Sequence, residues 1–167
     1  MHTAYLPELT QAQAEYLLSP EESNHVVKVM RMGEGDQLWV VNGTGGKATA
    51  NILFAHHKKC QISVQNFEFE EAPEKEVHIA IAPTKMMDRL NWFVEKATEL
   101  GVDRISLIKC ANNERGVVKT EKLHKTALSA MKQSKRLYLP VIEELTDFKS
   151  FISKNPLGYI AYTDKDI

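Results

Sequence analysis

Residues 85–102 read Lys-Met-Met-Asp-Arg-Leu-Asn-Trp-Phe-Val-Glu-Lys-Ala-Thr-Glu-Leu-Gly-Val, and the prediction of the fold depends on them. The pattern predicts a loop followed by a helix that has Asp88 as its N-cap and ends at Gly101. Apolar residues recur every three or four positions, as on the buried side of an amphipathic helix. The residues on this predicted apolar stripe are Leu90, Phe93, Val94, Ala97 and Leu100.

Trp92 lies on the opposite side of this predicted helix, away from the apolar stripe. Two interpretations are open. In the first, Trp92 covers a neighbouring loop or a partner helix, because Trp is enriched at interfaces. In the second, it forms part of the wall of a substrate or cofactor site, with Lys85 and Arg89 beside it as anion-binding groups.

The first 72 residues have the pattern of a small β-rich barrel or sheet with one helix. Ser19-Pro20-Glu21-Glu22 predicts a capped helix start with proline at its first position. Gln37–Asn42 and Lys47–His56 predict the two strands of a hairpin, and Cys60–Phe69 predicts a further strand. The acidic, proline-containing segment 68–76 places a domain boundary near Ala72.

Beyond this boundary, strands alternate with helices. Val77–Ala82 and Arg104–Lys109 are predicted strands on either side of the helix described above, so they form a parallel βαβ unit. A second helix is predicted from Thr120 or Glu121 to Ser134.

A third unit is predicted after this second helix. Thr146 is its expected N-cap, and Phe148, Phe151 and Ile152 lie on one face of a short helix that breaks at Asn155-Pro156. We expect a strand at Gly158–Tyr162 to follow.

Composition limits the class of protein. The chain has 167 residues, 43% of them hydrophobic, and a net charge of −1. No apolar run approaches the roughly 20 residues of a membrane span, and the N-terminus lacks the regions of a signal peptide, so we expect a cytoplasmic location. Cys60 and Cys110 are far apart and suggest no disulfide framework.

Positive charge is concentrated in one part of the chain. Residues 84–136 contain twelve Lys and Arg against six Asp and Glu, whereas residues 1–72 contain five against nine. This excess suits a phosphate-bearing partner, although ordinary solvated helix faces have the same composition.

Polar residues at the ends of the predicted elements are the candidate site. Lys85 and Arg89 follow the first strand of the βαβ unit, and Glu114 and Arg115 follow the second. Because both loops leave the same edge of a parallel sheet, these side chains are expected to converge on a phosphate-rich ligand there. A third group, Gln133, Ser134 and Arg136, ends the next helix.

Other site chemistry finds no support in the sequence. Gly43, Gly45 and Gly46 lie in the predicted hairpin turn and do not open a helix, so no dinucleotide or phosphate-loop motif is present. His56, His57 and Cys60 lack further ligands at suitable spacing, and we predict no metal site. No nucleophile of the hydrolase kind is indicated.

Four segments together resemble the RsmE family of ribosomal RNA methyltransferases. They are Lys85 to Trp92, Glu95-Lys96-Ala97-Thr98-Glu99-Leu100-Gly101-Val102, Glu114-Arg115-Gly116-Val117-Val118 and Gln133-Ser134-Lys135-Arg136. His25-Val-Val-Lys-Val-Met-Arg31 and Gly35-Asp36 resemble the first domain of that family. The resemblance covers nearly the whole chain in the same order.

The resemblance implies a PUA-like RNA-binding β-barrel over residues 1–72, followed over residues 73–167 by part of an α/β SPOUT-type methyltransferase domain. It also implies a homodimer that transfers a methyl group from S-adenosylmethionine to N3 of one uridine in 16S ribosomal RNA of the small subunit. On this basis the candidate catalytic residues are Lys85, Arg89 and Arg115. The candidate RNA-binding residues are these three together with Arg31 and Arg136. Asp88, Trp92, Lys96 and Glu99 are motif positions whose roles are open to a structural explanation.

The sequence departs from the family in two places. Lys132 stands where many relatives have Glu. The Ile-Gly-Pro-Glu-Gly-Gly-Phe loop and the Leu-Gly-x-Arg-Ile-Leu-Arg-x-Glu-Thr-Ala segment, which form the family's knot and cofactor pocket, do not occur in residues 1–167. We therefore expect the knot region to be absent and the cofactor-binding residues to lie beyond Ile167. The alternatives are a non-catalytic ribosomal RNA-binding module and a small-ligand α/β protein, which would bind no RNA.

Overall fold

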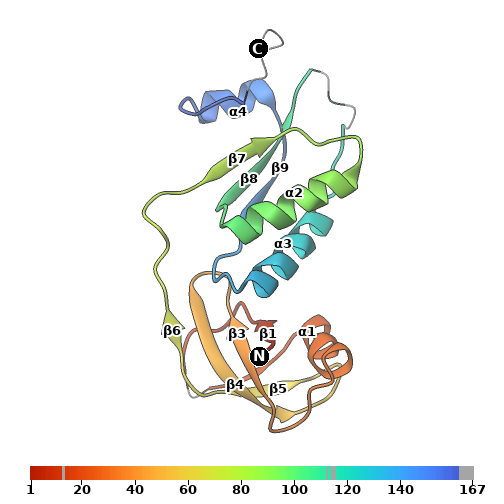
Figure 1. Ribbon diagram of the computed structural model, residues 1–167, viewed down its shortest axis with the longest axis vertical. Helices are drawn as coiled ribbons and strands as arrows, with labels where there is room; N and C mark the ends of the chain where they lie inside the picture. Colours follow the sequence, from red (N-terminus) through yellow and green to blue (C-terminus); the bar gives the residue numbers. More distant parts are fainter. Residues whose placement is uncertain (13, 112, 114–115, 162–167) are drawn as a thin grey trace.

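The computed structural model describes residues 1–12, 14–111, 113 and 116–161 as two units stacked along the long axis of the molecule (Figure 1). The first unit contains β1 (Thr3–Tyr5), β2 (Glu15–Leu17), α1 (Pro20–Asn24), the π-helical turn His25–Val29, β3 (Gln37–Val41), β4 (Gly46–Phe54), β5 (Gln61–Val64) and β6 (Glu68–Phe69). The second contains β7 (His78–Ile81), α2 (Met87–Leu100), β8 (Arg104–Lys109), α3 (Thr120–Ser134), β9 (Val141–Asp147) and α4 (Phe148–Lys154).

The first unit is a mixed six-stranded sheet with the strand order β1-β3-β4-β5-β2, in which β6 pairs with β4. Alternate residues of the strands point inward, and the largest buried side chains include Leu38, Ile52 and Ile62. The predicted helix start is confirmed, because the Ser19 side chain accepts a hydrogen bond of 3.2 Å from the backbone N–H of Glu22. This cap positions the Glu22 carboxylate at the boundary with the second unit.

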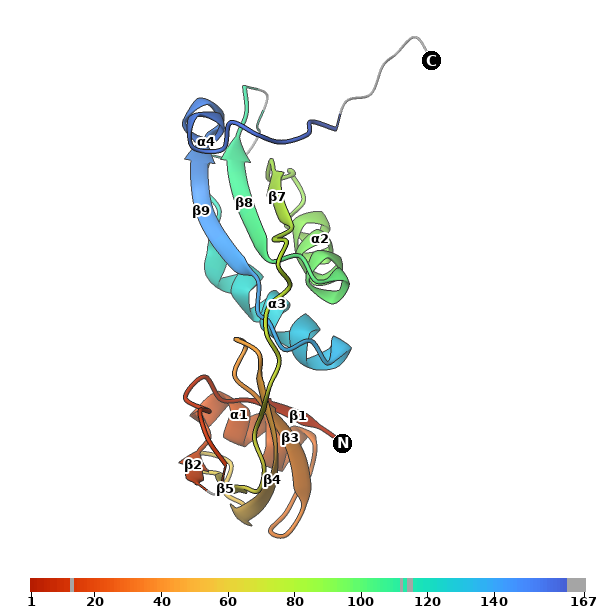
Figure 2. The same ribbon diagram turned by 90° about the vertical axis from the view of Figure 1, so that its left-hand side faces the viewer.

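The second unit is a parallel three-stranded sheet in the order β7-β8-β9. Helices α2 and α3 cover one face of it (Figure 2). The core between helices and sheet contains Leu90, Val94, Ile105, Leu107 and Leu123, all fully buried. The predicted βαβ unit and the second helix are thereby confirmed.

Helix α2 differs from its prediction in its N-cap and in the position of Leu100. Its N-cap is Met86, which gives no side-chain hydrogen bond, so Asp88 lies inside the first turn, where a negative charge suits the helix dipole. Gly101 is the C-cap, as predicted, with a φ of 87°. Leu100 does not join the apolar stripe, since it is 79% exposed beside the helix end.

The strand predicted at Gly158–Tyr162, after the short third helix, was wrong. The third strand is β9, which precedes α4. The N-cap of α4 is Asp147 and not Thr146, and the Asp147 carboxylate accepts hydrogen bonds from the backbone N–H groups of Lys149 and Ser150. Residues 158–161 form no strand and are exposed, while Tyr162 lies outside the described residues. An irregularity in the pairing of β9 with β8 lets Ile142 and Leu145 both reach the core, which breaks the alternation expected of a strand.

A short β-bridge joins the two units. The turn between β3 and β4 pairs with the segment after α3 through an antiparallel bridge between Thr44 and Tyr138. The Gly45 N–H donates to the Leu137 carbonyl at 3.0 Å, and the Tyr138 hydroxyl donates to the Glu70 carbonyl at 2.6 Å. Gly45 is required here, because its φ is 99° and a Cβ would lie 2.4 Å from the Glu70 oxygen.

A buried ion pair also crosses the boundary. The Lys132 ammonium lies 2.5 Å from Glu22, with side-chain exposures of 16% and 7%. The other carboxylate oxygen of Glu22 accepts the Tyr5 N–H at 3.1 Å. One carboxylate thus connects α1, β1 and α3.

We expect Lys132→Met to lower the free energy of unfolding by about 3–5 kcal/mol, because it leaves the Glu22 charge buried without its partner. Lys125 is the matched control, since it pairs with Glu21 at 3.4 Å with both side chains more than two thirds exposed. Lys125→Met should cost less than about 1 kcal/mol. Urea denaturation followed by circular dichroism measures the free energy of unfolding of both variants. Equal losses would contradict the conclusion that the pair of Lys132 with Glu22 is buried and stabilising.

Candidate functional site

Lys85 and Arg89 lie at the edge where the parallel strands end. Lys85 is in the loop that follows β7, and Arg89 is in the first turn of α2. Both side chains are exposed. The Thr84 hydroxyl donates to the Met86 carbonyl at 2.8 Å and shapes the loop just before the helix. Two cations therefore flank the positive end of the α2 dipole.

The loop after β8 leaves the same edge, because β7 and β8 are adjacent and parallel, with Ile79 opposite Ile105. Glu114 and Arg115 lie outside the described residues, so the predicted approach of Arg115 to Lys85 stays a prediction. Of the described residues that follow, Gly116 and Val117 are exposed and Val118 is buried.

Arg136 lies at the other end of the sheet, beside the first unit. It follows the C-terminus of α3, and its Nε donates to the Glu99 carbonyl at 3.1 Å. A Cβ on Gly101 would lie 2.8 Å from its guanidinium. Arg136 therefore packs over the C-terminal end of α2, and the structure does not bring it together with Lys85 and Arg89.

The remaining predicted residues are distributed over the surface. Arg31, from the first unit, is exposed with a left-handed φ of 56° and follows Met30, the C-cap of the π-helical turn. Trp92 is 63% exposed on the outer side of α2. Lys96 lies 2.9 Å from both Glu95 and Glu99, and the hydrogen bond that it donates to Glu95 contributes most to raising the pKa of Lys96. These ion pairs give Lys96 and Glu99 a structural role on the surface of α2.

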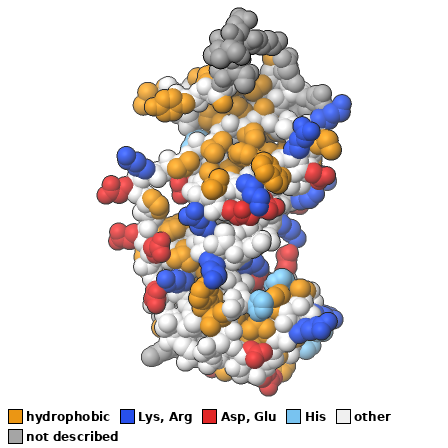
Figure 3. Space-filling model, in the orientation of Figure 1, with side chains coloured by type: hydrophobic (Ala, Val, Ile, Leu, Met, Phe, Trp, Pro, Cys, Tyr) orange, Lys and Arg blue, Asp and Glu red, His pale blue; other side chains and the backbone are white. Residues whose placement is uncertain are grey.

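Figure 3 shows how these charges are arranged on one face of the molecule. Positive and negative side chains alternate where the two units meet, and apolar side chains gather over the upper part of the second unit. Among the described residues, no helix is long and apolar enough to cross a membrane.

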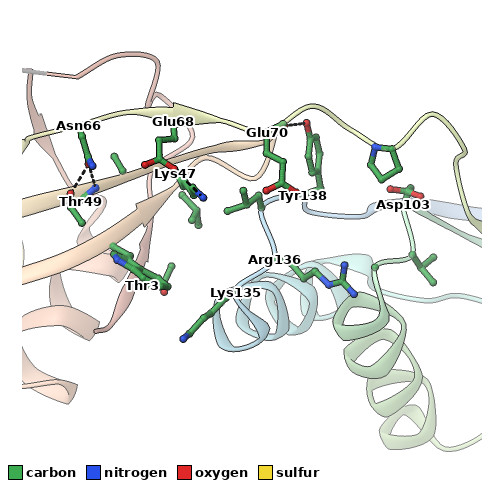
Figure 4. A pocket seen from close by; sticks show the side chains of 17 residues that line it. Thr3, Lys47, Thr49, Asn66, Glu68, Glu70, Asp103, Lys135, Arg136 and Tyr138 are labelled. Carbon is green, nitrogen blue, oxygen red and sulfur yellow. Dashed lines mark hydrogen bonds and ion pairs between the residues drawn. The ribbon is translucent and has the colours of Figure 1, made fainter.

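A cleft of about 520 Å³ lies between the two units (Figure 4). We call it the junction cleft. From the first unit it is lined by Trp39, Thr49 and Asn66, and Lys47 forms an ion pair with Glu68 at 3.1 Å on its wall. Sequence reasoning missed it.

Two cations enter the junction cleft from the end of α3. Lys135 and Arg136 leave this helix end in different directions, Lys135 toward the first unit and Arg136 toward α2 (Figure 4). The Lys135 ammonium lies 5.0 Å from the centre of the Trp39 ring, which is a cation–π contact. The left-handed φ of Lys135, 57°, turns the chain at this point.

A polar network covers the sheet face opposite α2 and α3. The Ser106 hydroxyl donates its proton to Glu143 and lies 2.7 Å from His78 Nε2, from which it can accept, and Glu143 pairs with Arg104 at 2.9 Å. The Ser106 hydrogen bond and then Arg104 hold the pKa of Glu143 below its ordinary 4.5. Because Ser106 is fully buried and donates to a carboxylate, it is held as a structural group and not as a nucleophile.

The two regions of the chain match two domain families. Residues 70–166 match the model of an RNA methyltransferase domain, and residues 18–65 match that of an RNA methyltransferase PUA domain. The chain belongs to the RNA methyltransferase family. Within it, the resemblance to RsmE is confirmed by the ribosomal RNA small subunit methyltransferase E of Bacillus subtilis, which is 30% identical over 90% of this chain and 62% of its own length.

Solved structures have the same fold. A probable rRNA-methyltransferase from Porphyromonas gingivalis is 36% identical, with a TM-score of 0.80 over 91% of this chain and 63% of its own. A putative methyltransferase from Legionella pneumophila, solved with the bound cofactor SAM, is 24% identical, with a TM-score of 0.82 over 91% of this chain and 65% of its own. This chain therefore spans less than two thirds of the length of each of these relatives.

We expect Glu143→Gln to lower the stability of the fold at neutral pH, as measured by thermal unfolding. A carboxylate with a lowered pKa contributes stability above its ordinary pKa and loses it as the pH falls through the lowered value. The difference from the unsubstituted protein should therefore shrink below about pH 4.5. Glu74→Gln, in the exposed connection between the units, is the control and should show no such dependence. A difference that persists at low pH would contradict the role of the charge.

Proposed function

We propose that this protein is an S-adenosylmethionine-dependent methyltransferase that acts on N3 of one uridine in 16S ribosomal RNA of the small subunit. The observation that carries the proposal is the pair of exposed cations, Lys85 and Arg89, at the strand ends of an RNA methyltransferase domain. The similarity to the Bacillus subtilis enzyme supports the choice of ribosomal RNA. The choice of N3 rests on the resemblance to the RsmE family.

In this proposal the two units have different roles. Residues 1–72 are a PUA-like domain that contacts the RNA backbone, with Arg31 among the contacts, and residues 73–167 belong to a SPOUT-type domain. Open α/β sheets bind ligands beyond the carboxyl ends of their strands, which supports a reaction site near Lys85. The protein acts in the cytoplasm as a homodimer.

The chemistry explains why cations are needed at this edge. Uracil N3 carries a proton, and methylation of N3 requires that this proton leave the ring. The negative charge that develops spreads onto O2 and O4 of the base. Fixed positive groups near these oxygens stabilise that charge. Lys85, Arg89 and Arg115 are the residues proposed for this role.

The cofactor would supply the methyl group, but the described residues do not by themselves fit it. Three clefts stand out on the described surface, of about 520, 840 and 440 Å³, and the loops after β7 and β8 line none of them. None of these three clefts therefore offers a place for an adenosine at the strand ends. This agrees with the absence of the family's cofactor-loop motifs from residues 1–167.

The same observation favours a second candidate, a ribosomal RNA-binding module without methyl transfer. Calorimetric titration of residues 1–167 with S-adenosylmethionine addresses this point directly. We expect no stoichiometric binding. Clear one-to-one binding would show that the cofactor site is made by these residues.

The methylation itself is tested in cells that carry the gene. Nucleoside mass spectrometry of 16S ribosomal RNA should detect 3-methyluridine, and disruption of the gene should remove it. Lys85→Ala or Arg89→Ala should slow its formation on the order of 100-fold, as expected when a group that stabilises developing charge is lost.

Lys75→Ala, in the exposed connection between the units, is the matched control and should leave methylation unchanged. If 3-methyluridine persists after disruption of the gene, the proposal is wrong. If methylation is normal in both edge variants, the roles given to Lys85 and Arg89 are wrong.

A further inference from the structure

We infer that the junction cleft binds one unpaired nucleotide of an RNA strand, with its base against Trp39 and its phosphate toward the end of α3. This inference rests on the proposed function in that it takes the ligand to be RNA. It goes beyond that function by placing a second RNA contact at the opposite end of the second unit from Lys85 and Arg89.

Trp39 is placed as a platform for a base. On β3 its neighbours Leu38 and Val40 point into the core, so the Trp39 ring points outward. Its partners across the sheet are Thr3 on β1 and Thr49 on β4, and all three line the cleft. These two small side chains leave space beside the large ring. The Lys135 ammonium lies over the ring, 5.0 Å from its centre, so a base that stacks there takes the place of Lys135. Stacking on an aromatic side chain is the usual way in which proteins hold an unpaired base.

Asn66 supplies a directed hydrogen-bond donor near this platform. Its Oδ1 accepts both the Thr49 N–H at 2.8 Å and the Thr49 hydroxyl at 2.5 Å. With the oxygen occupied, the orientation of the amide is set, and Nδ2 must face away from Thr49. Within the described residues Nδ2 makes no hydrogen bond to the protein. An exposed amide N–H₂ can donate to the carbonyl oxygen of a base.

The charges around the junction cleft suit a phosphate at one end. The carboxylate of Glu68 is paired with Lys47, and that of Asp103 accepts the Val77 N–H at 2.8 Å. Lys135 and Arg136 project from the opposite wall (Figure 4). Arg136 uses Nε for the Glu99 carbonyl, which leaves its terminal nitrogens for another acceptor. Glu70 is a third carboxylate of the lining (Figure 4). Because Lys47 on the first unit is paired with Glu68, the cations placed for a phosphate are Lys135 and Arg136 on the α3 side, and the base-reading groups lie on the side of the first unit.

Size and accessibility favour one unpaired nucleotide. About 520 Å³ lies within the range of roughly 300–1,000 Å³ that small-ligand sites occupy. A base inside a duplex has both faces covered by its neighbours, so it cannot stack on Trp39. A single-stranded segment, or a nucleotide turned out of a helix, can do so. A free mononucleotide has the same chemistry, and the experiment separates it from RNA.

The experiment uses Trp39 as its own probe. The chain has two tryptophans, so the Trp92→Phe protein reports on Trp39 alone. We expect an unstructured RNA 12-mer to quench its fluorescence saturably, with an affinity that falls as salt is raised. Uridine monophosphate should quench only at far higher concentration. Fluorescence anisotropy of a labelled 12-mer measures total RNA binding in parallel.

Asn66→Ala, in the Trp92→Phe background, should raise the dissociation constant about tenfold, which corresponds to about 1.4 kcal/mol. Gln65→Ala is the matched control, because the side-chain amide of this neighbouring residue bonds to Ser63, its one partner among the described residues, and does not line the cleft. Circular dichroism verifies that both variants fold. The control should bind as the parent does.

Three results would overturn the inference. One is RNA binding in the anisotropy measurement without quenching of Trp39. The second is an equal effect of the Asn66 and Gln65 substitutions, and the third is uridine monophosphate binding as tightly as the 12-mer. None of these bears on 3-methyluridine in 16S ribosomal RNA, so the proposed methylation and the site in the junction cleft can fail separately.

Discussion

The desolvated carboxylate of Glu22 is the constraint on which the arrangement of the two units depends. It lies on a helix whose start is fixed by Ser19, and it accepts hydrogen bonds from Tyr5 in the first unit and Lys132 in the second. A buried charge without a partner is costly, so the units are held in the position that satisfies it. The β-bridge between Thr44 and Tyr138 fixes the same position through the backbone. The junction cleft lies between the two units that these contacts hold together.

Much of the fold could be predicted from local sequence patterns, and the failures have physical causes. The stripe on α2 and the parallel strands β7 and β8 follow from periodicities within a few residues. Strand β9 has two adjacent glutamates and a pairing irregularity, and Arg104 and Ser106, which neutralise Glu143, come from another strand. The apolar residues 157–160 are exposed, so hydrophobicity alone suggested a strand that packing does not form.

Of the two candidate sites, one could be predicted from the sequence and the other could not. Loops after adjacent parallel strands must leave one edge, so the location of Lys85 and Arg89 followed from topology. The pairing of Trp39 with Lys135 joins residues that no local pattern connects. Lys132 illustrates the limit well. In the sequence it was a departure from the family at one position, and only the structure shows that Glu22 lies beside it.

Glu22 and Lys132 are 110 residues apart in the chain, and this separation determines the order in which the protein can fold during its synthesis. The first unit can complete its own core once Phe69 has left the ribosome, because every strand of its sheet has then been made. The cleft must wait until α3 and Tyr138 have followed. Closing so long a loop is slow compared with forming local structure. A partly synthesised chain therefore has a folded first unit but no place to hold a nucleotide between the two.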